Sequence, residues 1–148
     1  LYSGKKKMYR ALAISNLVSI HIKSHIGDLS AFCGAVSAAC GAGAGITYLY
    51  GGGLEEISGT INNTLANVSG IVCDGAKPAC AAKIASAVDA AIMAHDMSMK
   101  GRGFKPGEGI VGSTVEETLK SVGYMGRVGM KETDVEILKL MTGAVNLD

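Results

Sequence analysis

The chain has 148 residues, a length that fits a single domain. Its 14 Lys and Arg nearly balance its 13 Asp and Glu, which leaves a net charge of +1 at pH 7. A hydrophobic fraction of 48% with so little net charge excludes a disordered chain. Because basic residues barely outnumber acidic ones, the composition argues against a nucleic-acid-binding protein. With 21 Gly and 5% aromatic residues, the core must depend on close approach of backbones rather than on large side chains.

Two long helices are predicted in the first third of the chain, because apolar residues recur at helical spacing and glycines punctuate them. The first covers about residues 6–26, and its predicted core face consists of Met8, Ala11, Leu12, Val18, Ile22 and Ile26. The second covers about residues 30–50, within 26 uncharged residues of which seven are Gly. Because so few of these residues favour insertion into a bilayer, we interpret the segment as a buried central helix rather than a membrane span.

Four further helices are predicted after the triple glycine at 51–53. They cover about residues 54–72, 79–99, 113–122 and 132–141. In the helix at 79–99, a narrow face of small residues is formed by Ile84, Val88, Ala91 and Ala94. A break containing Gly75 and Pro78 separates the first two of these helices. The sequence therefore predicts an all-α fold, a compact bundle of five to seven helices around a central Ala/Gly-rich uncharged helix. We assign residues 1–148 to one domain.

The first residue is Leu1, and amphipathic sequence follows almost at once without a cleavage-site pattern. We therefore expect a cytoplasmic protein, and we expect this chain to be part of a longer one. In a reducing compartment, cysteines serve as ligands or as core thiols more often than in disulfides.

The four cysteines follow the spacing C-x6-C-x32-C-x6-C, at positions 33, 40, 73 and 80. Structural zinc sites usually pair ligands two to four residues apart, so this spacing is unusual for zinc. The segment between Cys73 and Cys80 must loop, and its N–H groups, with the helix that follows, can direct positive charge at an iron–sulfur cluster. Spacing alone leaves plain structural thiols as the leading interpretation and the cluster as the alternative.

Residues 29–35 (LSAFCGA) and 69–80 (SGIVCDGAKPAC) resemble the C-terminal part of the L-cysteine desulfidase family. That family is related to the alpha chain of iron–sulfur L-serine dehydratases, and the resemblance runs from the first helix to about Met141. It implies a [4Fe-4S] cluster whose iron is held by Cys33, Cys73 and Cys80. Cys40 has no ligand counterpart in the family and is interpreted as a packing thiol.

The resemblance also implies a reaction. Three cysteines leave one iron of the cluster open for an amino acid. The implied function is β-elimination without pyridoxal phosphate (PLP), which converts L-cysteine to pyruvate, ammonia and sulfide, or L-serine to pyruvate and ammonia. The family's catalytic base lies in an N-terminal part that this chain does not include, so the chain is expected to be inactive alone. Expected partners are the amino-acid substrate, that N-terminal part and a second copy in a homo-oligomer, with no nucleic acid and no membrane.

Several other residues are weaker candidates. Asp74 and Lys77 lie between two of the predicted ligands, where they either tune the cluster and contact substrate or serve as solvated loop charges. His21 and His25 lie four residues apart, as two metal ligands can, but packing or solvation is the favoured interpretation. The same holds for His95, for which proton transfer stays open. The Gly-rich segment 101–112 either covers the site or only connects helices. The alternative function is a non-catalytic helical module with structural cysteines.

Overall fold

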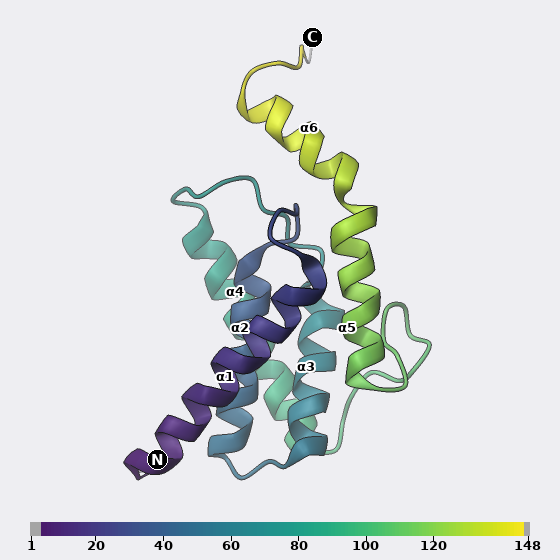
Figure 1. The fold of residues 1–148 in the computed structure, drawn as a ribbon. Coiled ribbons are helices and arrows are strands. Elements are labelled where there is room, and N and C mark those ends of the chain that lie inside the picture. Colours follow the sequence, from purple (N-terminus) through teal and green to yellow (C-terminus); the bar gives the residue numbers. More distant parts are fainter. Residues whose placement is uncertain (1–3, 147–148) are drawn as a thin grey trace.

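The computed structural model describes residues 4–146, and within that range it contains six α-helices joined by loops (Figure 1). The helices are α1 (Lys5–Ile26), α2 (Gly34–Leu49), α3 (Leu54–Val68), α4 (Cys80–Met99), α5 (Val115–Tyr124) and α6 (Lys131–Met141). A π-helical turn, η1 (Met125–Gly129), joins α5 to α6. The predicted all-α bundle is confirmed. Leu1, on which the expectation of a longer protein rested, lies outside the described residues.

Helix α2 is the centre of the bundle and packs against α1, α3 and α4. Its glycines make this possible. A side chain at Gly41 would come within 2.2 Å of the main-chain oxygen of Ser15 on α1. A side chain at Gly43 would lie 3.1 Å from Thr60 of α3 and from Ala91 of α4. Since α2 carries no charge and approaches three helices this closely, the predicted central Ala/Gly-rich helix is confirmed.

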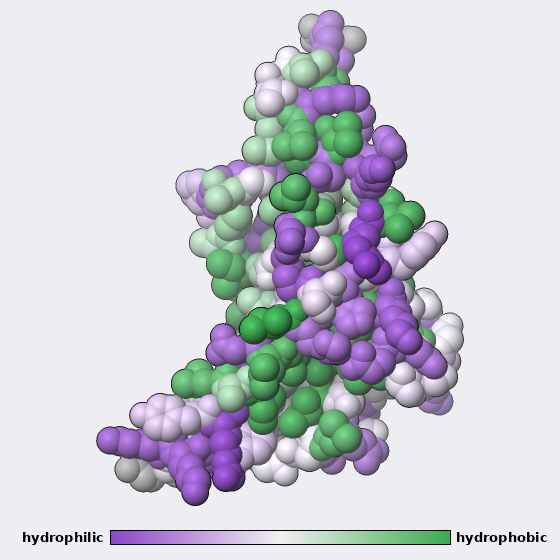
Figure 2. Space-filling view, in the orientation of Figure 1, coloured by the Kyte–Doolittle hydropathy of each residue, from purple (hydrophilic) through white to green (hydrophobic). Residues whose placement is uncertain are grey.

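The buried side of α1 matches the predicted one only in part. Met8 and Leu12, predicted to face the core, are 42% and 51% exposed. The buried residues of α1 are Ala11, Ile22 and Ile26. The reason is the close contact with α2, because only small side chains fit where the two backbones meet, so Ala11 and Ser15 occupy that line. The exposed apolar residues of α1, among them Met8 and Leu12, contribute to the hydrophobic outer surface seen in Figure 2.

Two helices are shorter than predicted. Each is shortened at the end that adjoins a segment carrying a cysteine. Helix α2 begins at Gly34 rather than near residue 30, and α3 ends at Val68 rather than near residue 72. The residues left over pair with one another in extended backbone around an isolated antiparallel bridge between Phe32 and Val72. Hydrogen bonds between these segments therefore replace bonds that a longer helix would make.

The C-terminal helices extend the bundle on one side. Helix α5 packs against α1 and α3, whereas α6 packs only against η1 and has no buried residue. In Figure 1, α6 projects beyond the other helices. Its far end nevertheless reaches the loop before α4, where the methyl group of Met141 lies against Gly75. No helix within residues 4–146 combines the length and the hydropathy needed to cross a membrane.

Substitution of Gly41 by alanine tests the α1–α2 contact. We expect Gly41→Ala to lower the free energy of unfolding by about 1–3 kcal/mol, because the added methyl group meets the Ser15 backbone, which cannot rotate away. Urea unfolding followed by circular dichroism measures this. Gly34→Ala on the same helix is the matched control, because nothing lies within 4 Å of its added atom. An equally stable Gly41→Ala protein would contradict the close contact.

Candidate functional site

Two backbone hydrogen bonds bring distant cysteines together. The N–H of Cys33 donates to the carbonyl of Ile71 at 3.0 Å, and the N–H of Cys73 donates to the carbonyl of Ala31 at 2.6 Å. These bonds flank the Phe32–Val72 bridge and join the loop before α2 to the loop after α3. Two cysteines forty positions apart in the sequence thus lie on neighbouring extended segments.

The third cysteine reaches the same region from α4. Cys80 is the first residue of that helix, and its thiol lies 3.5 Å from the carbonyl oxygen of Gly75. Gly75 has a φ of 88°, a left-handed conformation that turns the loop back towards the helix. Cys33 directly precedes α2, and neither α2 nor α4 has a side-chain cap. Two of the three thiols therefore lie at helix N-termini, where the free N–H groups and the helix dipole favour negative charge.

Together the three cysteines line a cleft of about 600 Å³. The other lining residues are small or apolar: Gly34, Ala35, Ala38, Ala39, Ala42, Gly75, Ala76, Ile84 and Val88. Ile84, on the predicted small-residue face of α4, is 52% exposed and forms a wall of the cleft. Ala91 and Ala94, further along α4, are buried.

Cys40 lies apart from this cleft. It is fully buried in the hydrophobic core, and its sulfur is 4.0 Å from the carbonyl oxygen of Ile61 on α3. Burial raises the pKa of its thiol to about 12, which favours the neutral thiol. The interpretation of Cys40 as a packing thiol agrees with this position.

Asp74 anchors the loop between Cys73 and Cys80. One carboxylate oxygen pairs with the ammonium of Lys77 and the other with the ammonium of Lys83 on α4. Hydrogen bonds from Lys77 and then from Lys83 lower the pKa of Asp74 from 3.8 to about 2. The sequence left Asp74 and Lys77 either as residues around the cofactor or as solvated loop charges, and the structure places both in the loop that borders the cleft. Their effect on a cofactor stays a prediction.

The sequence reasoning missed Lys83. Its ammonium also donates to the carbonyl of Val72 at 2.8 Å, so it links α4 to the extended segment that carries Cys73. Its pKa is raised, first by the hydrogen bond to Asp74 and, by smaller amounts, by charge on Cys33 and Cys80. A positive group thus lies within electrostatic reach of two thiols. The signal available in the sequence was its position three residues after Cys80, on the same side of the helix.

The three cysteines that line the cleft are of the residue type that holds iron–sulfur clusters. All three are free thiols. Iron–sulfur clusters are held by thiolates bound to different irons, so these residues fit such a group.

The remaining candidates lie outside the cleft. His95 is buried in the bundle, with Nδ1 3.0 Å from the hydroxyl of Thr47 and its ring 4.9 Å from that of Tyr50. It is fifteen residues from Cys80 on α4, about 22 Å along the helix axis, and packing accounts for it. The Gly-rich segment 101–112 does not line the cleft and is held to Asn63 of α3 through Arg102 and Phe104. It is therefore a connector in this structure.

The fold and site define a helical domain that gathers three thiols from three segments around one apolar cleft. Residues 1–139 match the family described as "Serine dehydratase alpha chain". The chain belongs to this family. No solved structure matches it.

Three curated relatives illustrate the similarity, and each is a UPF0597 protein. The relative from Lachnoclostridium phytofermentans is 65% identical over 92% of this chain, and that from Desulfitobacterium hafniense is 58% identical over 95%. The relative from Finegoldia magna is 50% identical over 93%. The chain spans about a third of the length of each of these proteins.

Asp74 makes the anchoring of the loop pH-dependent. Because folding lowers its pKa from 3.8 to about 2, its stabilising contribution is complete above about pH 4 and is lost as the pH falls through about 2. We expect urea unfolding to show wild type more stable than Asp74→Asn at pH 6, with a difference that shrinks between pH 4 and pH 2. Asp89→Asn, on α4 and without an ion pair among the described residues, is the control. A difference that persists undiminished at pH 2 would argue against this anchor.

Proposed function

We propose that this chain is the [4Fe-4S]-binding domain of a PLP-independent lyase that catalyses β-elimination of L-cysteine or L-serine. One observation carries the proposal: Cys33, Cys73 and Cys80 line one cleft, and Cys40 does not. The same three positions match the ligands that the resemblance to the desulfidase family implies. Membership in the serine dehydratase alpha chain family supports the reaction class.

The chain's own residues prepare the cleft for an anionic group. When bound, a cluster held by three cysteines supplies one iron without a protein ligand, a Lewis acid for the substrate. Positive charge from the N-termini of α2 and α4 and from the ammonium of Lys83 stabilises the negative charge of the thiolates. Asp74 holds Lys83 in place, and Ile84 and Val88 limit the access of water from the α4 side.

The proposed reaction needs a base that removes the α-proton of the amino acid. The electron pair left behind expels sulfide from cysteine, or water from serine, and the aminoacrylate product hydrolyses to pyruvate and ammonia. We assign no base to this chain. The base is proposed to come from the part of the protein that corresponds to the remaining two thirds of the relatives, and that part and the amino acid are the proposed partners.

Cysteine is the preferred substrate in this proposal. The preference rests on the resemblance of the Cys-Asp-Gly-Ala-Lys segment (residues 73–77), and of the spacings between the three cysteines, to the desulfidase branch.

The second candidate function is a helical module whose cysteines are only structural. The burial of Cys33, which is 6% exposed, favours it, because a buried thiol also behaves as a small apolar side chain. The two candidates differ in one measurable property, the capacity to hold iron and sulfide.

Anaerobic reconstitution with iron and sulfide distinguishes them. We expect the wild-type chain to take up about four irons and to develop the visible absorbance of a cluster. Single changes of Cys33, Cys73 or Cys80 to Ser should abolish or strongly reduce both, since each removes a thiolate ligand. Cys40→Ser is the matched control and should retain the wild-type spectrum. A colourless wild-type protein, or equal loss in Cys40→Ser, would support the structural module.

Activity provides the second test. We expect the 148-residue chain with its cluster to release no pyruvate from L-cysteine or L-serine, because the proposed base is absent. A full-length relative, such as the protein from Desulfitobacterium hafniense, should do so under the same anaerobic conditions. Rapid turnover by the short chain alone would show that the base lies within these 148 residues.

A further inference from the structure

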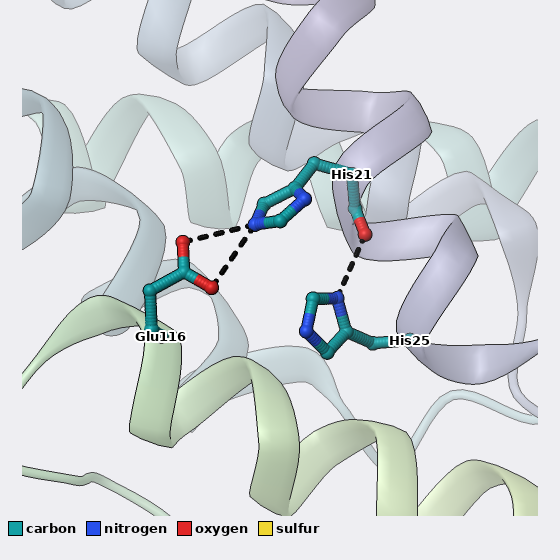
Figure 3. Close-up of side chains that lie close together, drawn as sticks. All are labelled: His21, His25 and Glu116. Carbon is teal, nitrogen blue, oxygen red and sulfur yellow. Dashed lines mark hydrogen bonds and ion pairs between the residues drawn. The ribbon is translucent and has the colours of Figure 1, made fainter.

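Helix α5 brings a carboxylate to the histidine pair of α1. His21 and His25 are one turn apart on α1, and Glu116 lies in the first turn of α5 (Figure 3). Nε2 of His21 lies 2.9 Å and 3.1 Å from the two carboxylate oxygens of Glu116. Sequence reasoning considered the histidines but had no third ligand, because Glu116 is 95 positions from His21 in the sequence.

The orientation of His25 leaves a ligand nitrogen free. Its Nδ1 is 2.9 Å from the main-chain carbonyl oxygen of His21, and since a carbonyl only accepts, Nδ1 must donate. Nε2 of His25 then carries a lone pair, and Figure 3 shows this nitrogen on the side of the ring that faces Glu116. A carbonyl that fixes the tautomer and orientation of a histidine in this way is the usual support of a metal ligand.

Distances and chemistry agree with one bound ion. One ligand atom from each of the three residues lies within 4.8 Å of the other two. Zinc binds imidazole nitrogen and carboxylate oxygen at about 2.0–2.2 Å, which places tetrahedral ligand atoms about 3.4 Å apart. A separation of 4.8 Å must therefore shorten by somewhat more than an ångström, while the contact between His21 and Glu116 must open slightly. His21 and Glu116 have room to move, because their side chains are 49% and 53% exposed.

We propose that His21, His25 and Glu116 bind a divalent transition-metal ion, with Zn²⁺ the best match to two imidazoles and a carboxylate. The fourth position is left to water. None of the three residues lines the three-cysteine cleft, so this site is separate from the one proposed for the cluster. An ion joining α1 to α5 would fasten the C-terminal helices to the bundle. An ion pair between His21 and Glu116 explains why those two side chains lie together. It does not explain why the free nitrogen of His25 faces them.

Metal titration of the folded chain tests the site. Cysteine thiolates are also zinc ligands, so the background is the chain with Cys33, Cys73 and Cys80 changed to Ser. We expect calorimetry to show one Zn²⁺ per chain, and Co²⁺ to give visible d–d bands without a sulfur-to-cobalt charge-transfer band. His25→Ala should weaken binding by more than about 100-fold, because loss of an outer-shell partner alone costs about 10- to 100-fold. Glu116→Gln should weaken it clearly, while Glu132→Gln, an exposed first-turn acid of α6, should not.

Two further measurements test the assignment directly. In the wild-type chain, Zn²⁺ should shift the NMR signals of the His21 and His25 imidazoles and leave those of buried His95 unchanged, which keeps the test valid if the triple cysteine variant does not fold. Hydrogen exchange of α5 should slow on addition of Zn²⁺ in wild type but not in Glu116→Gln. Absence of imidazole shifts, or binding equal in His25→Ala and wild type, would overturn the site. Binding without slower exchange in α5 would overturn its role as a link between helices.

Discussion

Two backbone hydrogen bonds, on either side of the Phe32–Val72 bridge, are the constraint on which the candidate site depends. Because of these bonds, α2 begins later and α3 ends earlier than helix periodicity predicts, and Cys33 is held beside Cys73. Once these segments are paired, the loop from residue 74 to residue 79 has to return to α4, and this places Cys80 at the same cleft. Lys83 stabilises the arrangement from α4 through the Val72 carbonyl and Asp74. The pairing of Cys33 and Cys73 therefore rests on main-chain hydrogen bonds, and the loop that leads to Cys80 also depends on the side chains of Asp74 and Lys83.

Much of the fold was predictable from the sequence, because helix periodicity and glycine breaks are local signals. All six helices were expected within a few residues of their observed bounds, as was the central position of the uncharged helix. The predicted inner face of α1 was partly wrong, because helical spacing of apolar residues placed Met8 and Leu12 on the same face as the buried Ala11. What decided the face was the distance between two backbones, and that depends on the glycines of another helix.

The site was predictable only in part, and the limit is again the distinction between local and distant information. The three cysteines were singled out through their segments, and the structure brings them to one cleft. Lys83 had only a weak local signal, its spacing from Cys80. Glu116 had none, because its contact with His21 exists only through the packing of α5 on α1. Residues that join a site from another helix can be identified only once the tertiary structure is known.

The glycine and alanine walls of the three-cysteine cleft have a consequence for its shape. Residues such as Gly34, Ala38 and Ala42 have no rotatable side chain that could swing inward and fill the space. This part of the wall therefore keeps the same side-chain conformation whether or not a guest is present, whereas the cysteines, Ile84 and Val88 have side chains that can rotate. Because these glycine and alanine residues have no side-chain freedom to lose, filling the cleft costs little conformational entropy on this part of its wall.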